Sequence, residues 1–302
     1  MHHLLSLQSL SAAEIERIID LGLKLKAERH AVQPAQPLRG QCWAMMFTKA
    51  STRTRVSFEV GVRELGGSVV YLSPGDTQLG RGEPIRDTAR VIGRMMAGAI
   101  IRTYAQSDVV EFAELSGIPT INALTDEEHP CQVLADLLTM QELCGGWKDK
   151  KVVFMGDGDN NMSRSWMWAA ERLGFELVIA APHNYQPTGE YLAQFKSRLI
   201  SCDANPDQAV QGADVLYTDV FVSMGQEHES AQRLDDLRSY QINAALVKRA
   251  RPGALVMHCL PAYREKEITA EVLEAHAGTI FQQAENRLHA QKAVLTLLQP
   301  TK

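Results

Sequence analysis

The 302-residue chain has few cysteines, little excess charge and no long hydrophobic run. Its five cysteines are scattered and odd in number and form no C-x-x-C pair, which argues against a disulfide framework or a structural zinc site. A net charge of −5 without a basic run argues against a nucleic-acid binder. Apolar stretches such as 95–101 are too short to span a membrane, and residues 1–7 do not resemble a signal peptide. A cytoplasmic enzyme with reduced thiols is therefore expected.

Short apolar segments alternate with helical patterns, which predicts an α/β fold with mostly parallel sheets flanked by helices. The expected strands are residues 43–47, 69–72, 99–103, 118–122, 151–155, 176–181, 214–217 and 254–259. Helical patterns between them include residues 84–96, 107–116, 130–143, 163–173 and 243–250. The length favours two domains. Because no Gly/Ser-rich linker is present, we expect interdomain helices to join them, with 130–143 as the best candidate.

The stretch Ser-Thr-Arg-Thr-Arg at 51–55 stands between a predicted buried strand and a predicted helix over 56–65. A helix start offers free N–H groups and the positive end of the helix dipole, and arginine forks match phosphate oxygens. A Ser/Thr cap with two solvated arginines is the alternative. Since one hydroxyl suffices for a cap, three hydroxyls and two arginines favour a phosphate site. The Gly-rich Walker pattern is absent, so a nucleotide is not the expected ligand.

A second polar cluster, His129-Pro130-Cys131-Gln132, opens the helix expected over 130–143. Proline is favoured in a first helical turn for stereochemical reasons alone, and His129 could be an ordinary cap. His129 and Gln132 could instead donate hydrogen bonds to a polar ligand. Both interpretations remain open from these residues.

Three more clusters follow predicted strands at their carboxyl ends, where open α/β sheets bind ligands. The loop 156–162 suits a tight turn slightly better than a ligand site. Asp219 could hold an ammonium group and Ser223 a carboxylate, although a capped loop explains these residues better when they are taken alone. Cys259 is either a small core side chain or a ligand contact. Arg287, near the expected start of the last helix at residue 284, is either a solvated charge or a third guanidinium for the anion.

In this order, the clusters resemble the aspartate/ornithine carbamoyltransferase family over essentially the whole chain. The matching motifs are F-x-K-x-S-T-R-T-R at 47–55, D-T-A-R-V at 87–91, Arg102, H-P-x-Q at 129–132, N-N-M at 160–162, Asp219 with S-M-G at 223–225, H-C-L-P at 258–261 and E-N-R at 285–287. S-M-G together with H-C-L-P indicates the ornithine branch of the family rather than the aspartate branch.

The resemblance implies transfer of the carbamoyl group of carbamoyl phosphate to the δ-amine of L-ornithine, giving L-citrulline and phosphate. The implied contacts of carbamoyl phosphate are Ser51, Thr52, Arg53, Thr54, Gln78, Arg102, His129, Gln132, Cys259, Leu260 and Arg287. The implied contacts of ornithine are Asn161, Asp219, Ser223 and Met224. The loop carrying Gln78 would reach the neighbouring site in a homotrimer. No metal or organic cofactor is implied, and the reaction would serve arginine biosynthesis or catabolism.

The implied catalytic residues divide into two pairs. Arg102 and His129, with the Thr54 hydroxyl, would stabilise the oxyanion of the tetrahedral intermediate. Asp219 and Cys259 would either take up the amine proton or only position the substrate. The implied carbamoyl phosphate-binding domain is 1–128 completed by helix 284–302, the interdomain helix is 129–145, and the ornithine-binding domain is 146–283.

Other functions fit the residues less well. A transferase acting on putrescine would not need Ser223-Met224-Gly225 to hold a carboxylate. A nicotinamide dehydrogenase requires an acidic residue after the strand at 176–181, where 180–183 is Ala-Ala-Pro-His. A non-enzymatic anion-binding protein has no use for Asp219 or Cys259. Within the pentad, Arg55 is expected to be structural, paired with Glu59 at helix spacing.

Overall fold

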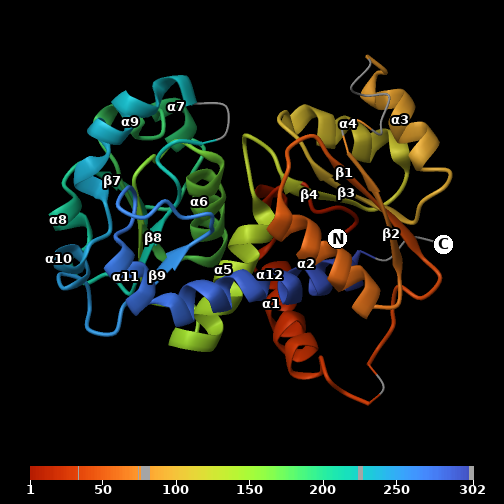
Figure 1. Ribbon diagram of the computed structural model, residues 1–302, viewed down its shortest axis with the longest axis horizontal. Coiled ribbons are helices and arrows are strands. Elements are labelled where there is room, and N and C mark those ends of the chain that lie inside the picture. The colour runs from red at the N-terminus through yellow and green to blue at the C-terminus, as the bar shows by residue number, and fades with distance from the viewer. Residues whose placement is uncertain (33, 74, 76–81, 224–226, 299–302) are drawn as a thin grey trace. The chain divides into compact units, whose positions relative to one another are not determined.

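The computed structural model describes residues 1–32, 34–73, 75, 82–223 and 227–298. The chain forms two compact units (Figure 1), of which the first comprises Met1–Leu138 with Glu285–Lys302 and the second Thr139–Ala284. Both boundaries therefore fall inside helices, α5 (Pro130–Cys144) and α12 (Ala277–Leu297). Among the described residues, no helix is long and apolar enough to cross a membrane.

The first unit is built on a four-stranded parallel sheet in the order β2-β1-β3-β4. Its strands are β1 (Cys42–Phe47), β2 (Ser68–Leu72), β3 (Gly98–Arg102) and β4 (Thr120–Leu124). Its further helices are α1 (Ala12–Ala27), α2 (Thr52–Glu64), α3 (Ile85–Ile92) and α4 (Gln106–Ser116). The predicted α/β class is confirmed, and these strands agree with the predicted ones to within two residues at each end.

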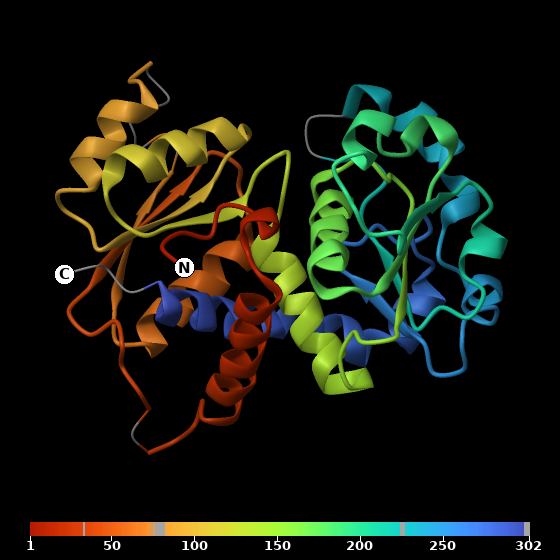
Figure 2. The same ribbon diagram turned by 180° about the vertical axis from the view of Figure 1, so that it is seen from behind.

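Helices cover both faces of this sheet, and its central strands are therefore buried on both sides. Alternate residues of β1 and β3, including Met46 and Ile101, pack with Phe112 of α4 in one apolar core. The residues between them point to the opposite face. Figures 1 and 2 show α3 and α4 over the first face and α2 with the end of α12 over the second. Arg102 follows Ile101 and therefore points toward the α2 and α12 face.

The second unit contains a five-stranded parallel sheet in the order β7-β6-β5-β8-β9. Its strands are β5 (Lys151–Met155), β6 (Glu176–Ala180), β7 (Ile200–Asp203), β8 (Val215–Thr218) and β9 (Leu255–His258). Strand β7 was not predicted. It is a four-residue edge strand without a buried residue, so it lacks the apolar run by which the other strands were found.

Aromatic side chains fill one side of this second sheet. Phe154 of β5 stacks on Tyr217 of β8 with ring centroids 5.6 Å apart, and Trp166 contacts Tyr217 edge-on at 5.2 Å. Trp166 belongs to α6 (Asn161–Leu173), which therefore packs on this face. The remaining helices are α7 (Gly189–Leu192), α8 (Pro206–Ala209), α9 (Ser230–Asp236), α10 (Ala244–Val247) and α11 (Ala270–Ala275).

The last helix corrects a prediction, because α12 begins at Ala277 rather than at residue 284. Gly278 and Thr279 are poor helix formers and hid this start in the sequence. Residues 286–295 are all buried, so the apolar periodicity of a surface helix is also missing. Tertiary contacts stabilise the added turns: Ile280 is fully buried, and Gln283 Oε1 accepts a hydrogen bond of 2.9 Å from the His258 N–H.

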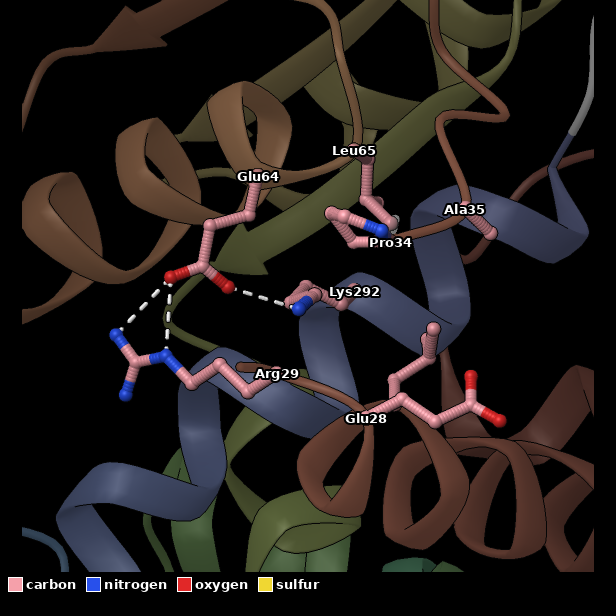
Figure 3. A pocket seen from close by; sticks show the side chains of 8 residues that line it. Glu28, Arg29, Pro34, Ala35, Glu64, Leu65 and Lys292 are labelled. Atoms are coloured by element: carbon pink, nitrogen blue, oxygen red, sulfur yellow. Dashed lines mark hydrogen bonds and ion pairs between the residues drawn. The ribbon is translucent and has the colours of Figure 1, made fainter. Parts of the chain in front are cut away.

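A pocket of about 110 Å³ lies in the first unit (Figure 3). Its lining residues are Leu25, Glu28, Arg29, Pro34, Ala35, Glu64, Leu65 and Lys292. The Glu64 carboxylate accepts hydrogen bonds from Arg29 Nε at 3.0 Å and Lys292 Nζ at 2.8 Å. These bonds link the segment after α1 to α2 and α12 and pair the charges of the three side chains within the chain.

Candidate active site

In the first unit, the candidate residues lie at the point where the strand order reverses. Strand β2 lies on one side of β1 and β3 on the other, so the crevice between the carboxyl ends of β1 and β3 is the expected ligand position. Ser51 follows β1, and Arg102 ends β3 directly beside Phe47. The fold thus places the predicted phosphate residues where open sheets bind ligands.

The start of α2 is built by the pentad at 51–55. Ser51 is the N-cap, and its Oγ accepts a hydrogen bond from the Thr54 N–H at 3.3 Å. No acidic residue lies in the first turn, so the positive end of the helix dipole is not compensated there. Arg287 Nη2 donates a 2.8 Å hydrogen bond to the buried Thr54 Oγ1. The arginine of the last helix therefore meets the first turn of α2.

Positive charge is concentrated around this helix start. Arg102 and Arg287 are only 7% and 3% exposed. Burial lowers the pKa of Arg102 to about 10, and repulsion from Arg287 and Arg53 adds to that effect. Three neighbouring guanidiniums, of which two are buried and that of Arg53 is half-buried, are unfavourable unless an anion joins them, so the arrangement suits a phosphate group.

Arg55 differs from Arg53, as predicted. Its Nε lies 3.6 Å from Glu59 Oε2 one helical turn later, and its guanidinium lies 3.8 Å from the ring centroid of Tyr71 on β2. The predicted pairing of Arg55 with Glu59 is confirmed. The pentad therefore contains one arginine in the cationic cluster and one that ties α2 to the neighbouring strand.

His129 and Gln132 are buried at the start of α5. Burial, with repulsion from Arg287 and Arg102, keeps the pKa of His129 well below 6.5, so its imidazole is neutral at pH 7. Gln132 Nε2 donates a 2.8 Å hydrogen bond to Asp136 Oδ1, one turn later on the helix. This bond fixes the amide with its Oε1 as a buried acceptor. Asp136 was missed, although its i, i+4 spacing from Gln132 could have revealed it.

Glu128, which precedes His129, was also missed. Its Oε1 accepts from Ser6 Oγ, and its Oε2 accepts from the Leu7 N–H at 3.0 Å. Burial raises its pKa from 4.5 to about 7, while the two hydrogen bonds oppose the rise. Glu128 anchors residues 6–7 next to His129 through a carboxyl group that titrates near neutrality.

In the second unit, the switch of strand order lies between β5 and β8, and candidate residues follow β5, β8 and the adjacent β9. Thr218 and His258 are partners in the β8 and β9 register, so Asp219 and Cys259 emerge side by side. Cys259 Sγ donates to Asp219 Oδ1 at 2.9 Å. Burial raises the pKa of Asp219, and the bond from Cys259 opposes that rise.

The loop after β5 is held by its own side chains. Asn160 caps α6 and accepts from the Met162 and Ser163 N–H groups, each at 2.9 Å, which leaves the half-buried Asn161 as the first helical residue. The observed cap agrees with the tight-turn interpretation of this loop.

The loop after β8 is fixed by an arginine that the sequence did not mark. Arg233 of α9 pairs with the buried Asp157 and donates from Nε to the Phe221 carbonyl at 2.9 Å. This arginine therefore links the loops after β5 and β8. Ser223 is half-buried in the second of these loops.

Some predicted features cannot be placed. Met224 and the Gln78 loop both lie outside the described residues. Among the residues that the structure describes, no three His, Cys, Asp or Glu side chains are grouped so as to hold a metal ion.

Parallel α/β units with polar side chains at their strand switch points, one of them with a buried guanidinium cluster, are the arrangement of α/β enzymes that bind small anionic substrates. The family model of the aspartate/ornithine carbamoyltransferase carbamoyl-P binding domain matches residues 2–142. The model of the Asp/Orn binding domain matches residues 148–298. The chain belongs to the aspartate/ornithine carbamoyltransferase family.

Individual relatives cover nearly the whole chain. The ornithine carbamoyltransferase of Akkermansia muciniphila is 58% identical over 300 residues, covering 99% of this chain and 98% of that protein. The Acinetobacter baylyi ornithine carbamoyltransferase is 47% identical over 298 residues, covering 99% and 97%. The solved ornithine carbamoyltransferase from Pyrococcus furiosus is 43% identical with a TM-score of 0.93, covering 99% of this chain and 97% of that one. The anabolic enzyme from Campylobacter jejuni is 40% identical with a TM-score of 0.92, covering 99% of both chains.

Glu128→Gln is expected to remove a pH dependence of stability. Because the folded-state pKa of Glu128 is raised from 4.5 to about 7, its stabilising contribution is complete below pH 4.5 and is lost as the pH rises through 7. The amide can bond Ser6 and Leu7 without charge. The variant should therefore gain stability relative to wild type as the pH rises from 5 to 8. The gain in free energy of unfolding should be at most about 3 kcal/mol, because a pKa difference of one corresponds to about 1.4 kcal/mol.

Urea unfolding midpoints at pH 5 and pH 8 measure this difference. Glu127→Gln is the matched control, because Glu127 is adjacent but exposed. An identical stability difference between Glu128→Gln and wild type at both pH values would contradict the titration of a buried Glu128.

Proposed function

We propose that this chain is a transferase that moves the carbamoyl group of carbamoyl phosphate to the δ-amine of L-ornithine, releasing L-citrulline and phosphate. The observation that carries the proposal is the cluster of Arg53, Arg102 and Arg287 at the start of α2. It occurs in a chain whose full-length relatives at 58% and 47% identity are named ornithine carbamoyltransferases.

The first unit would hold carbamoyl phosphate. Ser51, Thr52, Arg53 and Thr54 would bind the phosphate oxygens with the help of the free N–H groups of α2. Arg102 and Arg287 would supply the remaining positive charge around the phosphate group. Because Arg287 occupies one lone pair of Thr54 Oγ1, the hydroxyl proton of Thr54 remains available for the ligand.

The carbamoyl end of this substrate has its own partners. The neutral His129 would donate to the carbonyl oxygen, and Arg102 would share that oxygen with the phosphate. Gln132 Oε1, whose amide is oriented by Asp136, would accept from the carbamoyl NH₂ group. The family resemblance adds Gln78, Cys259 and Leu260 to this substrate's contacts.

The second unit would hold ornithine through Asn161, Asp219, Ser223 and Met224. Asp219 would bind the α-ammonium group, and Ser223 with the Met224 backbone would bind the α-carboxylate. The support for this assignment is that Asp219 and Asn161 follow β8 and β5, the strands that flank the switch of strand order.

Chemistry requires a neutral amine and a stabilised oxyanion. A free alkyl ammonium has a pKa of about 10.4, so a group must favour the neutral amine or accept its proton. Asp219 and Cys259 are the candidates, because burial raises the pKa of Asp219 toward that of a usable base. Arg102, His129 and Thr54 would donate to the oxyanion. Losing one donor of this kind raises a barrier by about 2.7–4 kcal/mol.

Residues 1–128 with the C-terminal helix would form the carbamoyl phosphate-binding domain, 129–145 the connecting helix, and 146–283 the ornithine-binding domain. We also place the reaction in arginine biosynthesis, in line with the anabolic relative from C. jejuni. A cytoplasmic location is supported by five cysteines that form no disulfide.

A homotrimer with the Gln78 loop at the neighbouring site is supported by apolar side chains on the surface of the first unit. Val70 on the edge strand β2 is 37% exposed, and Val56 on α2 is 54% exposed. On or just beyond α3, Val91 is 50% and Met95 71% exposed. Exposed apolar side chains of this kind suit contact with another copy of the chain.

Formation of citrulline and phosphate from carbamoyl phosphate and ornithine tests the proposed function. We expect turnover with ornithine and at most traces with aspartate or putrescine, because Ser223 and Met224 select an α-carboxylate beside a long amine. Activity with putrescine equal to that with ornithine would refute the substrate assignment, and absence of phosphate release would refute the reaction.

The two arginines of the pentad should behave differently. Arg53→Ala should weaken carbamoyl phosphate binding by at least about 100-fold, or about 2.7 kcal/mol, because it removes charge-assisted hydrogen bonds to phosphate. Arg55→Ala should leave binding nearly unchanged and lower stability by about 1 kcal/mol, because it loses only the Glu59 and Tyr71 contacts. Calorimetric titration and thermal unfolding distinguish the two effects, and the reverse pattern would overturn this assignment.

Replacing Cys259 should change the pH profile of the reaction. In Cys259→Ala, Asp219 loses the hydrogen bond that lowers its pKa, so the acidic limb of kcat/KM for ornithine should move to higher pH. Cys259→Ser keeps a donor and serves as the matched control. If Cys259→Ala keeps the wild-type affinity, turnover and pH profile, Cys259 has no role in the reaction.

A further inference from the structure

The turn after β9 has an unusual backbone. Leu260 has a φ of 57°, in the left-handed region that few non-glycine residues adopt. The turn begins with Cys259, whose Sγ donates to Asp219 Oδ1. Such a conformation persists only where neighbouring groups hold it in place. Neighbouring groups must therefore hold Cys259 and Leu260 in this conformation.

His258 supplies the direct contact. Its ring is buried, and its Nδ1 accepts a 2.9 Å hydrogen bond from the Leu260 N–H. Because a backbone N–H can only donate, Nδ1 carries a lone pair, and the ring proton of the neutral imidazole must lie on Nε2. The backbone of His258 is fixed as well, since its N–H donates to Gln283. The turn therefore depends on one tautomer of one ring.

Glu267 selects that tautomer. Its side chain is fully buried, and its Oε1 lies 3.1 Å from His258 Nε2 and also accepts from the Tyr263 N–H. The Glu267 backbone is held because its carbonyl accepts a 2.9 Å hydrogen bond from the Ile242 N–H. The carboxylate is thus a fixed acceptor aimed at the ring nitrogen that must carry the proton.

We propose that Glu267 is a positioning residue for this reaction and that it acts through His258 on the turn that carries Cys259 and Leu260. The inference rests on the proposed function, which assigns that turn to the substrates. Without the Glu267 acceptor, the ring proton can move to Nδ1, where it would face the Leu260 N–H donor to donor. The turn would then relax, and Cys259 would leave Asp219.

Kinetics of two variants test the proposal. Glu267→Ala should lower kcat for citrulline formation by about 10- to 100-fold, as a misplaced reacting group does. Its KM for carbamoyl phosphate should rise by a smaller factor than kcat falls, because Glu267→Ala disturbs only the Cys259 and Leu260 contacts and leaves the phosphate contacts of the first unit untouched. Glu267→Gln keeps an acceptor oxygen for His258 and should retain activity within about threefold of wild type. Glu274→Ala, which removes an exposed glutamate paired only with Arg264, is the control and should match wild type.

A second measurement does not depend on activity. Alkylation of Cys259 by iodoacetamide, followed by peptide mass spectrometry, should be several-fold faster in Glu267→Ala and unchanged in Glu267→Gln, because release from Asp219 exposes the thiol. Cys42, which lies in the other unit, is the internal reference. If wild type forms no citrulline, the proposed function fails, while the alkylation rates still decide the role of Glu267.

His258 provides the test if Glu267→Ala does not fold. His258→Asn can place an acceptor oxygen near the position of Nδ1, whereas His258→Leu cannot, so the asparagine variant should keep the higher kcat and the slower Cys259 alkylation. Equal values for the two His258 variants would overturn the proposal. Wild-type kcat and Cys259 alkylation in Glu267→Ala would also overturn it, as would equal losses in Glu267→Ala and Glu267→Gln.

Discussion

Repulsion among three neighbouring guanidiniums, two of them buried, is the constraint on which the first unit depends. Arg102 ends a central strand, Arg53 starts α2 and Arg287 belongs to the last helix, and each is brought in by a different element. Holding like charges together is unfavourable: burial is the main cause of the lowered pKa of Arg102, and repulsion from Arg287 and Arg53 adds to it. The apolar cores on both sides of the sheet supply the rigidity that keeps the charges in place. Binding of a dianion would relieve this repulsion. Because the fold already holds the three arginines in place, little free energy is spent on arranging them when the anion binds.

The second unit has a similar topology but holds an acidic group where the first unit holds a cluster of arginines. This acidic group, Asp219, is half-buried beside Cys259, and burial raises its pKa. In both units the ligand groups follow the strands at which the order of the sheet reverses. One unit therefore concentrates positive charge, which in the proposed reaction would receive the leaving group. The other places a half-buried carboxylate at its strand ends, which in the same proposal would bind the cationic amino acid.

Sequence reasoning succeeded where chemistry is local. The pentad at 51–55 and the apolar strands were predictable because hydroxyls, arginines and buried runs act over a few residues. It failed where tertiary contacts decide. The early start of α12 at Ala277 depends on the contact of Gln283 with His258, and the role of Glu267 depends on a ring nine residues away. No local pattern marks either. The role of the Glu128 carboxyl group could not be predicted either, because it depends on contacts with Ser6 and Leu7, which are distant in the sequence.

The anchor at Glu128 also bears on the edge of the first sheet. Leu4 pairs with Ile121 on the open side of β4, with hydrogen bonds from the Leu4 N–H to Thr120 and from the Asn122 N–H to Leu4. This short segment is the cover of that edge, and an uncovered edge strand is a template for pairing with other chains. Because the Glu128 carboxyl group holds residues 6–7, a change that releases Ser6 and Leu7 from it would uncover this edge and favour self-association through β4 before the unit as a whole unfolds.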